Sequence, residues 1–322
     1  MARTDGWAFV VNPISGNGYG AACATVIKDA MARHGVSGEI ALTRAKGHAV
    51  ELAASFAEKG FSPIIGVGGD GTIGEVGQAL IGRPGVVFGG VPAGTGNDLV
   101  HIFGFQDRFK EQDWGTLFEA TALPMDAGCC NGRYFFNGMG LGFDAQVAFE
   151  NYHMDNGGGV RAGSRSKYFW HVLKTLHSYK EREMLITIEG RKEKRTCFLN
   201  TIANGRRLAG GFMITPKAMA DDGLLDYCTA DPLSLPMRVK GLATVMNGTH
   251  LHQSFIHYAQ LPGMLIEFEN EVPAHLDGEI IFASRFAISV APGAVRAIIN
   301  PKGDHYFLQP SLSGSPSATP AR

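Results

Sequence analysis

The first hundred residues alternate short apolar runs with segments of helical periodicity, and this alternation constrains the fold more than any other feature. Apolar side chains recur at helical spacing over residues 20–34, 48–59 and 73–81. The runs around these segments predict strands at residues 7–11, 39–43, 63–67 and 86–91. A βαβα order predicts a parallel sheet with helices on both faces.

Beyond about residue 125 the pattern changes to short β-rich segments separated by turn residues, which predicts a mainly antiparallel second domain. Two helical patterns, over residues 166–180 and 236–246, interrupt these segments. We therefore expect an α/β domain over 1–125 and a second domain over 126–293, with residues 294–308 a candidate to pack back on the first. Residues 309–322 have the composition of a disordered tail.

The composition excludes several classes of protein. The formal net charge is −1, without the basic excess typical of nucleic-acid-binding proteins. No run of about 18 uncharged apolar residues is present, so we expect no transmembrane segment. The apolar run at residues 7–11 is too short for a signal peptide. The five cysteines show no CxxC spacing, so the sequence indicates neither a zinc site nor a disulfide framework. We expect a cytoplasmic protein with no nucleic-acid partner, and a homodimer stays open.

Two glycine-rich turns follow the third and fourth predicted strands, at residues 68–72 and 92–98. In an open parallel sheet, ligands bind beyond the carboxyl ends of the strands. A tight glycine turn points backbone N–H groups outward, and the helix after it adds its positive end. These turns predict a phosphate-binding site that includes Gly68, Gly69, Asp70, Gly71 and Thr72.

The polar side chains of the two turns suggest how a nucleotide is held. A carboxylate beside phosphate would repel it, so Asp70 predicts Mg²⁺ bridging to the nucleotide phosphates. Thr72 and Thr95 can each donate a hydroxyl hydrogen bond to phosphate, and Asn97 or Asp98 can orient the loop. The plain alternative is that both turns are only tight strand–helix junctions. The P-loop pattern GxxxxGK[ST] is absent, and residues 66–71 match GxGxxG only superficially.

Taken in order, the motifs make the chain resemble the diacylglycerol kinase catalytic-domain family, which includes bacterial lipid kinases and the sphingosine and ceramide kinases. The likeness extends from about residue 7 to 300. The matching segments are residues 12–16, Thr43 with 47–49, 68–72, 92–98, 136–144, 204–205 with 210–211, 216–226 and 277–279.

The resemblance implies ATP bound between an α/β domain of the NAD kinase/diacylglycerol kinase type and a β-sandwich domain. The family's nucleotide-binding positions correspond to the loop at 68–72 and to Asn12, Thr43, Thr95, Asn97 and Asp98. The resemblance also implies a second, structural metal site. Its ligands would be the carboxylate of Asp222 and the backbone carbonyls of Met219 and Leu224.

The turn Asp277-Gly278-Glu279 would hold the acid–base pair. Two carboxylates separated by one glycine can point differently, one toward metal or phosphate and one toward the acceptor hydroxyl. Phosphoryl transfer depends mostly on positioning and charge neutralisation, with a carboxylate taking the hydroxyl proton. We assign Glu279 as the general base, with Asp277 a close second. A hairpin turn with solvated acids is the plain alternative.

We therefore expect an ATP-dependent kinase that phosphorylates diacylglycerol or a related lipid at the membrane surface. An NAD kinase-like enzyme is the nearest rival, although no Thr-Pro-Thr-Gly-Ser type segment is present. A non-catalytic nucleotide-binding regulatory protein is the other. A basic stretch with Arg161, Arg165 and Lys167 is either a solvated helix face or a membrane contact.

Overall fold

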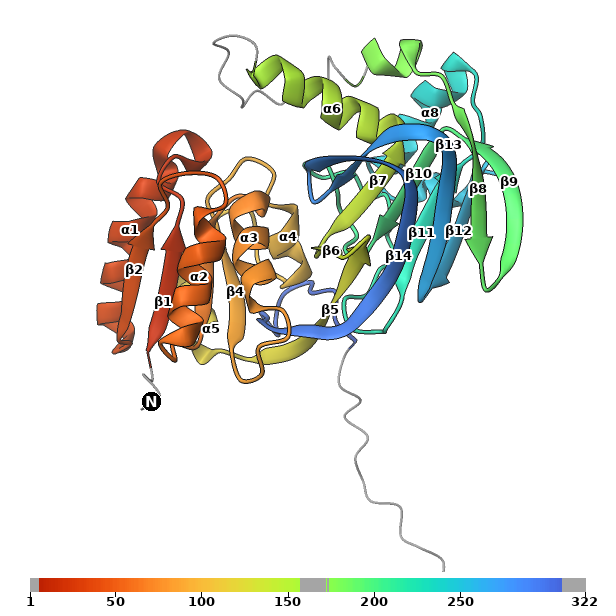
Figure 1. Ribbon diagram of the computed structural model, residues 1–322. Helices are drawn as coiled ribbons and strands as arrows, with labels where there is room; N and C mark the ends of the chain where they lie inside the picture. Colours follow the sequence, from red (N-terminus) through yellow and green to blue (C-terminus); the bar gives the residue numbers. More distant parts are fainter. Residues whose placement is uncertain (1–5, 157–171, 173, 309–322) are drawn as a thin grey trace, which may run out of the picture.

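The computed structural model describes residues 6–156, 172 and 174–308. An N-terminal α/β domain and a C-terminal β-sandwich domain lie side by side, and strands β5 and β14 run from one to the other (Figure 1). The predicted fold class is confirmed: a parallel sheet comes first and an antiparallel sandwich follows.

The α/β domain is built on a parallel sheet with the strand order β4-β3-β1-β2. Strand β3 is buried along its whole length, as expected for the interior of a parallel sheet. The strands are β1 (Trp7–Val11), β2 (Gly38–Leu42), β3 (Ile64–Gly68) and β4 (Val87–Pro92). The helices are α1 (Ser15–His34), α2 (His48–Glu58), α3 (Asp70–Leu80), α4 (Asp98–Ile102) and α5 (Glu111–Glu119).

Two helices begin earlier than the apolar spacing predicts. Helix α3 starts at Asp70, so the Asp-Gly-Thr part of the first glycine motif forms a helical turn. Gly69 is the extended residue before it, and its carbonyl accepts the N–H of Ile73. Helix α1 starts at Ser15, but residues 16–18 have positive φ and interrupt its first turn. Apolar periodicity cannot detect these polar first turns.

The C-terminal domain consists of two antiparallel layers around one apolar core. One layer has the order β12-β11-β10-β7-β13, and the other contains β14, β5, β6, β8 and β9 together with the first half of β13. The first strands are β5 (Ala122–Cys130), β6 (Arg133–Phe135), β7 (Gly138–Gly142), β8 (Arg182–Ile188) and β9 (Arg191–Cys197). The others are β10 (Leu199–Ala203), β11 (Leu225–Ala230), β12 (Ile256–Leu261), β13 (Gly263–Leu276) and β14 (Glu279–Ile298).

The apolar segment at residues 196–203 predicts one β-strand from the sequence, and this prediction is wrong. The structure has the end of β9, a break at Phe198, and then β10. The chain changes layer at the break, because β9 pairs with β8 whereas β10 pairs with β7 and β11.

Strand β14 spans 20 residues and joins the two domains. It pairs with β13 and β5 in the sandwich, and Arg296 and Ala297 then pair in parallel with β4. After the strand, Ile299, Tyr306 and Phe307 are buried in the core of the α/β domain. The chain therefore returns to its first domain at the end (Figure 1).

Helices cover the outer face of the β10–β11 layer. They are α6 (Phe143–Asn156), α8 (Leu235–Val245) and the short η1 (Thr249–His252). Of the helix predicted over 166–180, residues 172 and 174–180 are described; residues 172 and 174–178 are helical, whereas residues 179 and 180 are not. The basic residues Arg161, Arg165 and Lys167, like the predicted tail at 309–322, lie outside the described residues.

Candidate active site

Three turns meet at the carboxyl ends of β1, β3 and β4. The side-chain amide of Asn12 donates to Thr72 Oγ1 at 3.0 Å, which joins the first turn to α3. The two glycine motifs touch directly, because a Cβ on Gly94 would lie 2.3 Å from the Cα of Gly69. A side chain on Gly16 would likewise lie 2.3 Å from the carbonyl of Ala93. Glycine is required here because backbone packs on backbone.

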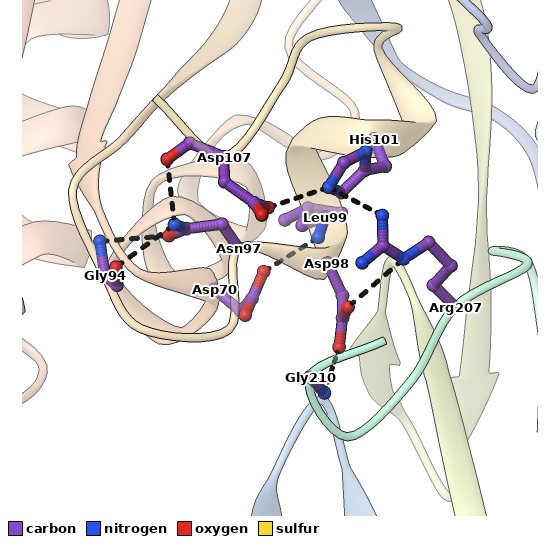
Figure 2. A network of polar contacts seen from close by, with 9 residues as sticks. All are labelled: Asp70, Gly94, Asn97, Asp98, Leu99, His101, Asp107, Arg207 and Gly210. Atoms are coloured by element: carbon purple, nitrogen blue, oxygen red, sulfur yellow. Dashed lines mark hydrogen bonds and ion pairs between the residues drawn. The ribbon is translucent and has the colours of Figure 1, made fainter. Parts of the chain in front are cut away.

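The carboxylate of Asp70 caps helix α4 (Figure 2). Its Oδ1 accepts the N–H of Leu99 at 2.7 Å, and the backbone N–H groups of Asn97 and Asp98 also stabilise its charge. Burial outweighs these donors and raises the pKa of Asp70 above its usual value. Part of the hydrogen-bonding capacity of Asp70 is therefore used to hold the second glycine turn against the first.

Asn97 closes the second glycine turn. It has a positive φ of 58°, and its side chain accepts the N–H of Gly94 at 2.9 Å and donates to the Gly94 carbonyl at 3.1 Å. It also donates to the carbonyl of Asp107 at 3.2 Å. These contacts fix the turn, while Thr95 at its tip is exposed.

Asp98 links the two domains. Its Oδ2 accepts the N–H of Gly210 in the loop after β10 at 2.6 Å, and its Oδ1 lies 3.9 Å from Nε of Arg207 (Figure 2). Burial, followed by repulsion from Asp70, raises the pKa of Asp98 to about 7. This contact brings the second glycine turn against the Asn204–Gly211 segment.

Arg207 continues this network and was not foreseen from the sequence. Its Nη1 lies 2.9 Å from Nε2 of His101, which is also 2.9 Å from Oδ1 of Asp107. The network therefore joins α4, the loop after it and the sandwich domain (Figure 2). No local pattern marks Arg207, because its partners lie about a hundred residues earlier in the chain.

Asp277 lies in the hairpin turn between β13 and β14 and holds the backbone of another strand. Its carboxylate accepts three backbone N–H groups, from Phe136 at 2.7 Å and from Asn137 and Gly138 at 2.9 Å each. Burial raises its pKa to about 6 even so. Asp277 and Gly278 both have positive φ, so the hairpin alternative describes the backbone correctly.

Glu279 makes a further contact between the domains. Its carboxylate lies 2.8 Å from Nζ of Lys46, in the turn after β2. Both side chains are exposed. Thr43, at the start of the same turn, is half-buried and donates its N–H to the Val11 carbonyl. The structure thus brings Glu279 to the domain that carries the glycine motifs.

The predicted structural metal site lies in the loop before β11. Asp222 accepts the N–H of Leu224 at 2.9 Å, and Asp126, which the sequence did not single out, accepts the N–H of Gly223 at 2.7 Å. Burial raises the pKa of Asp222, and the charge of Asp126 adds to the shift. Among the described residues, no group of three or more His, Cys, Asp or Glu side chains is arranged to hold a metal ion.

An apolar pocket lies between the β10–β11 layer and the helices that cover it. Its lining side chains include Phe143 and Val147 of α6, Leu199 and Ala230 of the strands, and Leu242 and Val245 of α8. Asp144 and Arg238 are the charged residues in the lining.

Asp144 connects this pocket to the hairpin that carries Glu279. Its Oδ2 accepts the hydroxyl of Thr201 at 3.0 Å and lies 3.6 Å from Nε2 of His275. His275 stands two residues before Asp277 on β13 and pairs with Gly140 across the layer. Asp144 of α6 therefore contacts the strand that leads into the predicted catalytic turn.

Comparisons with known proteins match the two domains of the chain to two family models. Residues 6–130 match the family described as "Diacylglycerol kinase catalytic domain". Residues 137–299 match "YegS C-terminal NAD kinase beta sandwich-like domain". The chain belongs to the diacylglycerol kinase catalytic-domain family. The resemblance inferred from the motifs is thereby confirmed.

Curated relatives extend the match over most of the chain. A "Probable lipid kinase YegS-like" protein of Pseudomonas aeruginosa (strain UCBPP-PA14) is 30% identical over 277 residues, which are 84% of this chain and 87% of the relative. The "Diacylglycerol kinase" of Bacillus subtilis (strain 168) is 28% identical over 245 residues, covering 74% and 77%. These relatives assign the chain to a lipid kinase family.

Solved structures share the fold. A diacylglycerol kinase from Bacillus anthracis str. Sterne matches with a TM-score of 0.75 and 24% identity, over 94% of this chain and 99% of that one. Membership in a kinase family implies ATP as the phosphate donor. In the described part of the chain, no helix combines the length and apolarity needed to cross a membrane.

Proposed function

We propose that this protein is an ATP- and Mg²⁺-dependent lipid kinase that phosphorylates a hydroxyl of diacylglycerol or a related lipid. The observation that carries the proposal is the apolar pocket whose lining includes Asp144, a carboxylate 3.6 Å from His275 on the strand that leads into the β13–β14 hairpin. The apolar lining suits part of an acyl chain, and the cavity of about 80 Å³ would have to widen to take a longer one. As a lipid kinase, the protein would work in the cytoplasm and meet its acceptor at a membrane surface.

The residues around the glycine turns have the chemistry to hold the phosphate donor. Backbone N–H groups of residues 68–72, with the hydroxyls of Thr72 and Thr95, would bind phosphate oxygens. Asn12, Thr43, Asn97 and Asp98 would shape this site. The carboxylate of Asp70 would hold Mg²⁺ beside the phosphates, and the charge of the ion would offset theirs.

Glu279 is our proposed general base. The acceptor oxygen attacks the γ-phosphorus, the bond from that phosphorus to the β,γ-bridging oxygen breaks, and the hydroxyl proton passes to a Glu279 carboxylate oxygen. The carboxylate of Glu279 is exposed and forms an ion pair with Lys46, whose side chain is exposed as well. Asp277, by contrast, has three amide donors on its carboxylate, which favours a structural role for it.

A structural metal ion held by Asp222 and the carbonyls of Met219 and Leu224 is compatible with the charges nearby. Asp126 and Asp222 raise the pKa of Asp221, after the larger effect of burial. A divalent cation would relieve this repulsion, and oxygen ligands are the type that Mg²⁺ prefers.

The two alternative functions differ from a lipid kinase in what they bind or transfer. An NAD kinase-like enzyme must bind a polar dinucleotide, which the apolar pocket does not suit. A regulatory protein would bind nucleotide without transferring phosphate.

The test is phosphate transfer from labelled ATP to diacylglycerol, a phospholipid, a sphingoid base, an isoprenoid alcohol and NAD. We expect transfer to at least one lipid and none to NAD. Glu279→Ala and Asp70→Asn should abolish it, and Leu242→Trp, which narrows the pocket, should slow transfer to long-chain acceptors selectively. Val26→Trp, on an exposed position of α1, is the matched control. Transfer to NAD, or nucleotide binding with no transfer, would refute the proposal.

A further inference from the structure

Helix α8 presents an apolar face to solvent. Leu235, Val239, Ala243 and Met246 recur at helical spacing, within about 80° of one another around the helix. Their side chains are exposed, with 50% of Val239 and 56% of Met246 accessible. The outer face of a helix in a globular protein normally carries charged and polar residues. This face of α8 is therefore unusual for a helix in contact only with water.

The neighbouring face of α8 forms a wall of the apolar pocket. Leu242 and Val245 line the pocket. The buried Arg238 fixes the helix in place, because its guanidinium donates to the carbonyls of Leu233, Leu176 and Tyr179. The exposed apolar face and the pocket-lining face are thus neighbouring faces of one helix that is tied to the sandwich.

Exposed cations lie on α8 and on the segment bonded to it. Lys240 belongs to α8 itself. The bonds from Arg238 hold the neighbouring segment 174–182 against α8, and this segment carries the exposed Lys174, Lys180 and Arg182. Its acid Glu181 is bonded to Arg238 at 2.6 Å and leaves no net negative charge there. The surface combines exposed apolar side chains with excess positive charge.

We infer that the outer face of α8 docks on an anionic lipid bilayer and brings the apolar pocket to the membrane. The inference rests on the proposed function, since a lipid acceptor resides in a bilayer. Helices that lie in the membrane interface insert apolar side chains between head groups, and flanking cations are attracted to anionic lipids. The cations favour this occupant over a second copy of the chain, because two copies of one basic surface repel each other.

Vesicle co-sedimentation without ATP or acceptor lipid tests docking alone. We expect wild type to bind vesicles of phosphatidylglycerol and phosphatidylcholine more tightly than vesicles of phosphatidylcholine. The double variant Val239→Asp/Met246→Asp should bind the anionic vesicles at least tenfold more weakly, and Lys174→Glu/Lys240→Glu should lose the preference for anionic lipid. The control Val26→Asp changes a similarly exposed residue of α1 and should bind as wild type does.

A second assay separates failure of docking from failure of the proposed function. Transfer to a short-chain diacylglycerol dissolved as monomers should be equal in wild type and Val239→Asp/Met246→Asp. Equal vesicle binding by wild type and this double variant would overturn the inference even if transfer occurs. A wild-type dimer that becomes a monomer in the double variant would overturn it too, since a second copy would then cover this face.

Discussion

Removal of the Asp277 carboxylate should unfold the protein more readily, whereas removal of the Glu279 carboxylate should not. Asp277 joins the β13–β14 hairpin to the start of β7 through three amide hydrogen bonds. The bonded residues Phe136, Asn137 and Gly138 are all buried, so water cannot easily replace the lost acceptor. The carboxylate of Glu279, by contrast, forms an ion pair with the exposed side chain of Lys46.

The size of the effect follows from the number of amides. Each buried N–H left without a partner costs about 1–3 kcal/mol, so Asp277→Ala should lower the free energy of unfolding by about 3 kcal/mol or more. Asp277→Asn keeps one oxygen acceptor and turns an amide toward the N–H of Phe136, but it also removes a charge that the raised pKa of about 6 makes unfavourable at pH 7.5, so Asp277→Asn should be less destabilised than Asp277→Ala. An exposed ion pair contributes about 0–1 kcal/mol to stability, so Glu279→Ala should lower the free energy of unfolding by no more than this amount.

Urea denaturation followed by fluorescence measures these differences, with the three variants and wild type compared at pH 7.5. The expected order of stability is wild type and Glu279→Ala together, then Asp277→Asn, then Asp277→Ala. Phosphate transfer measured on the same samples should be lost in folded Glu279→Ala. If Asp277→Ala is as stable as wild type, the carboxylate does not hold β7 and the argument against Asp277 as the base is lost.

Two further predictions concern the glycine turns. The pKa of Asp98 is raised to about 7, so its ionised form disfavours folding and the stability of the wild type should fall as the pH rises from 5 to 8. Asp98→Asn should lose this pH dependence. Over the same range its free energy of unfolding should gain about 2–3 kcal/mol relative to wild type, as measured by thermal unfolding. Gly94→Ala places a Cβ against Gly69 and should lower the free energy of unfolding by about 1–3 kcal/mol. The control Gly74→Ala has open space at its Cβ and should not lower it. Equal melting temperatures for the two variants would contradict the close packing of the glycine turns.

Local patterns in the sequence were sufficient to predict the strands and glycine turns of the first domain. Strands such as β3 are short and apolar on both faces, and the glycine motifs follow them directly, so both could be read within a few residues of chain. The hairpin at Asp277 was also local, and Asp-Gly is a known turn signal.

Long-range contacts could not be read in this way. The partners of Asp277 are about 140 residues away, and the ion pair between Lys46 and Glu279 spans more than two hundred. Asp126 was overlooked because its neighbours in space, Gly223 and Gly293, come from distant loops. The pocket is likewise made of single side chains from several elements, which leave no motif in the sequence.

The return of β14 to the first domain has a consequence for synthesis on the ribosome. Arg296 and Ala297 pair with the outer edge of β4, and Ile299, Tyr306 and Phe307 then complete the first apolar core. For some two hundred residues of translation, the nascent first domain therefore carries an open sheet edge and an unfinished core. An open edge invites pairing with other chains, so the protein depends on its last strand to close the domain that is made first.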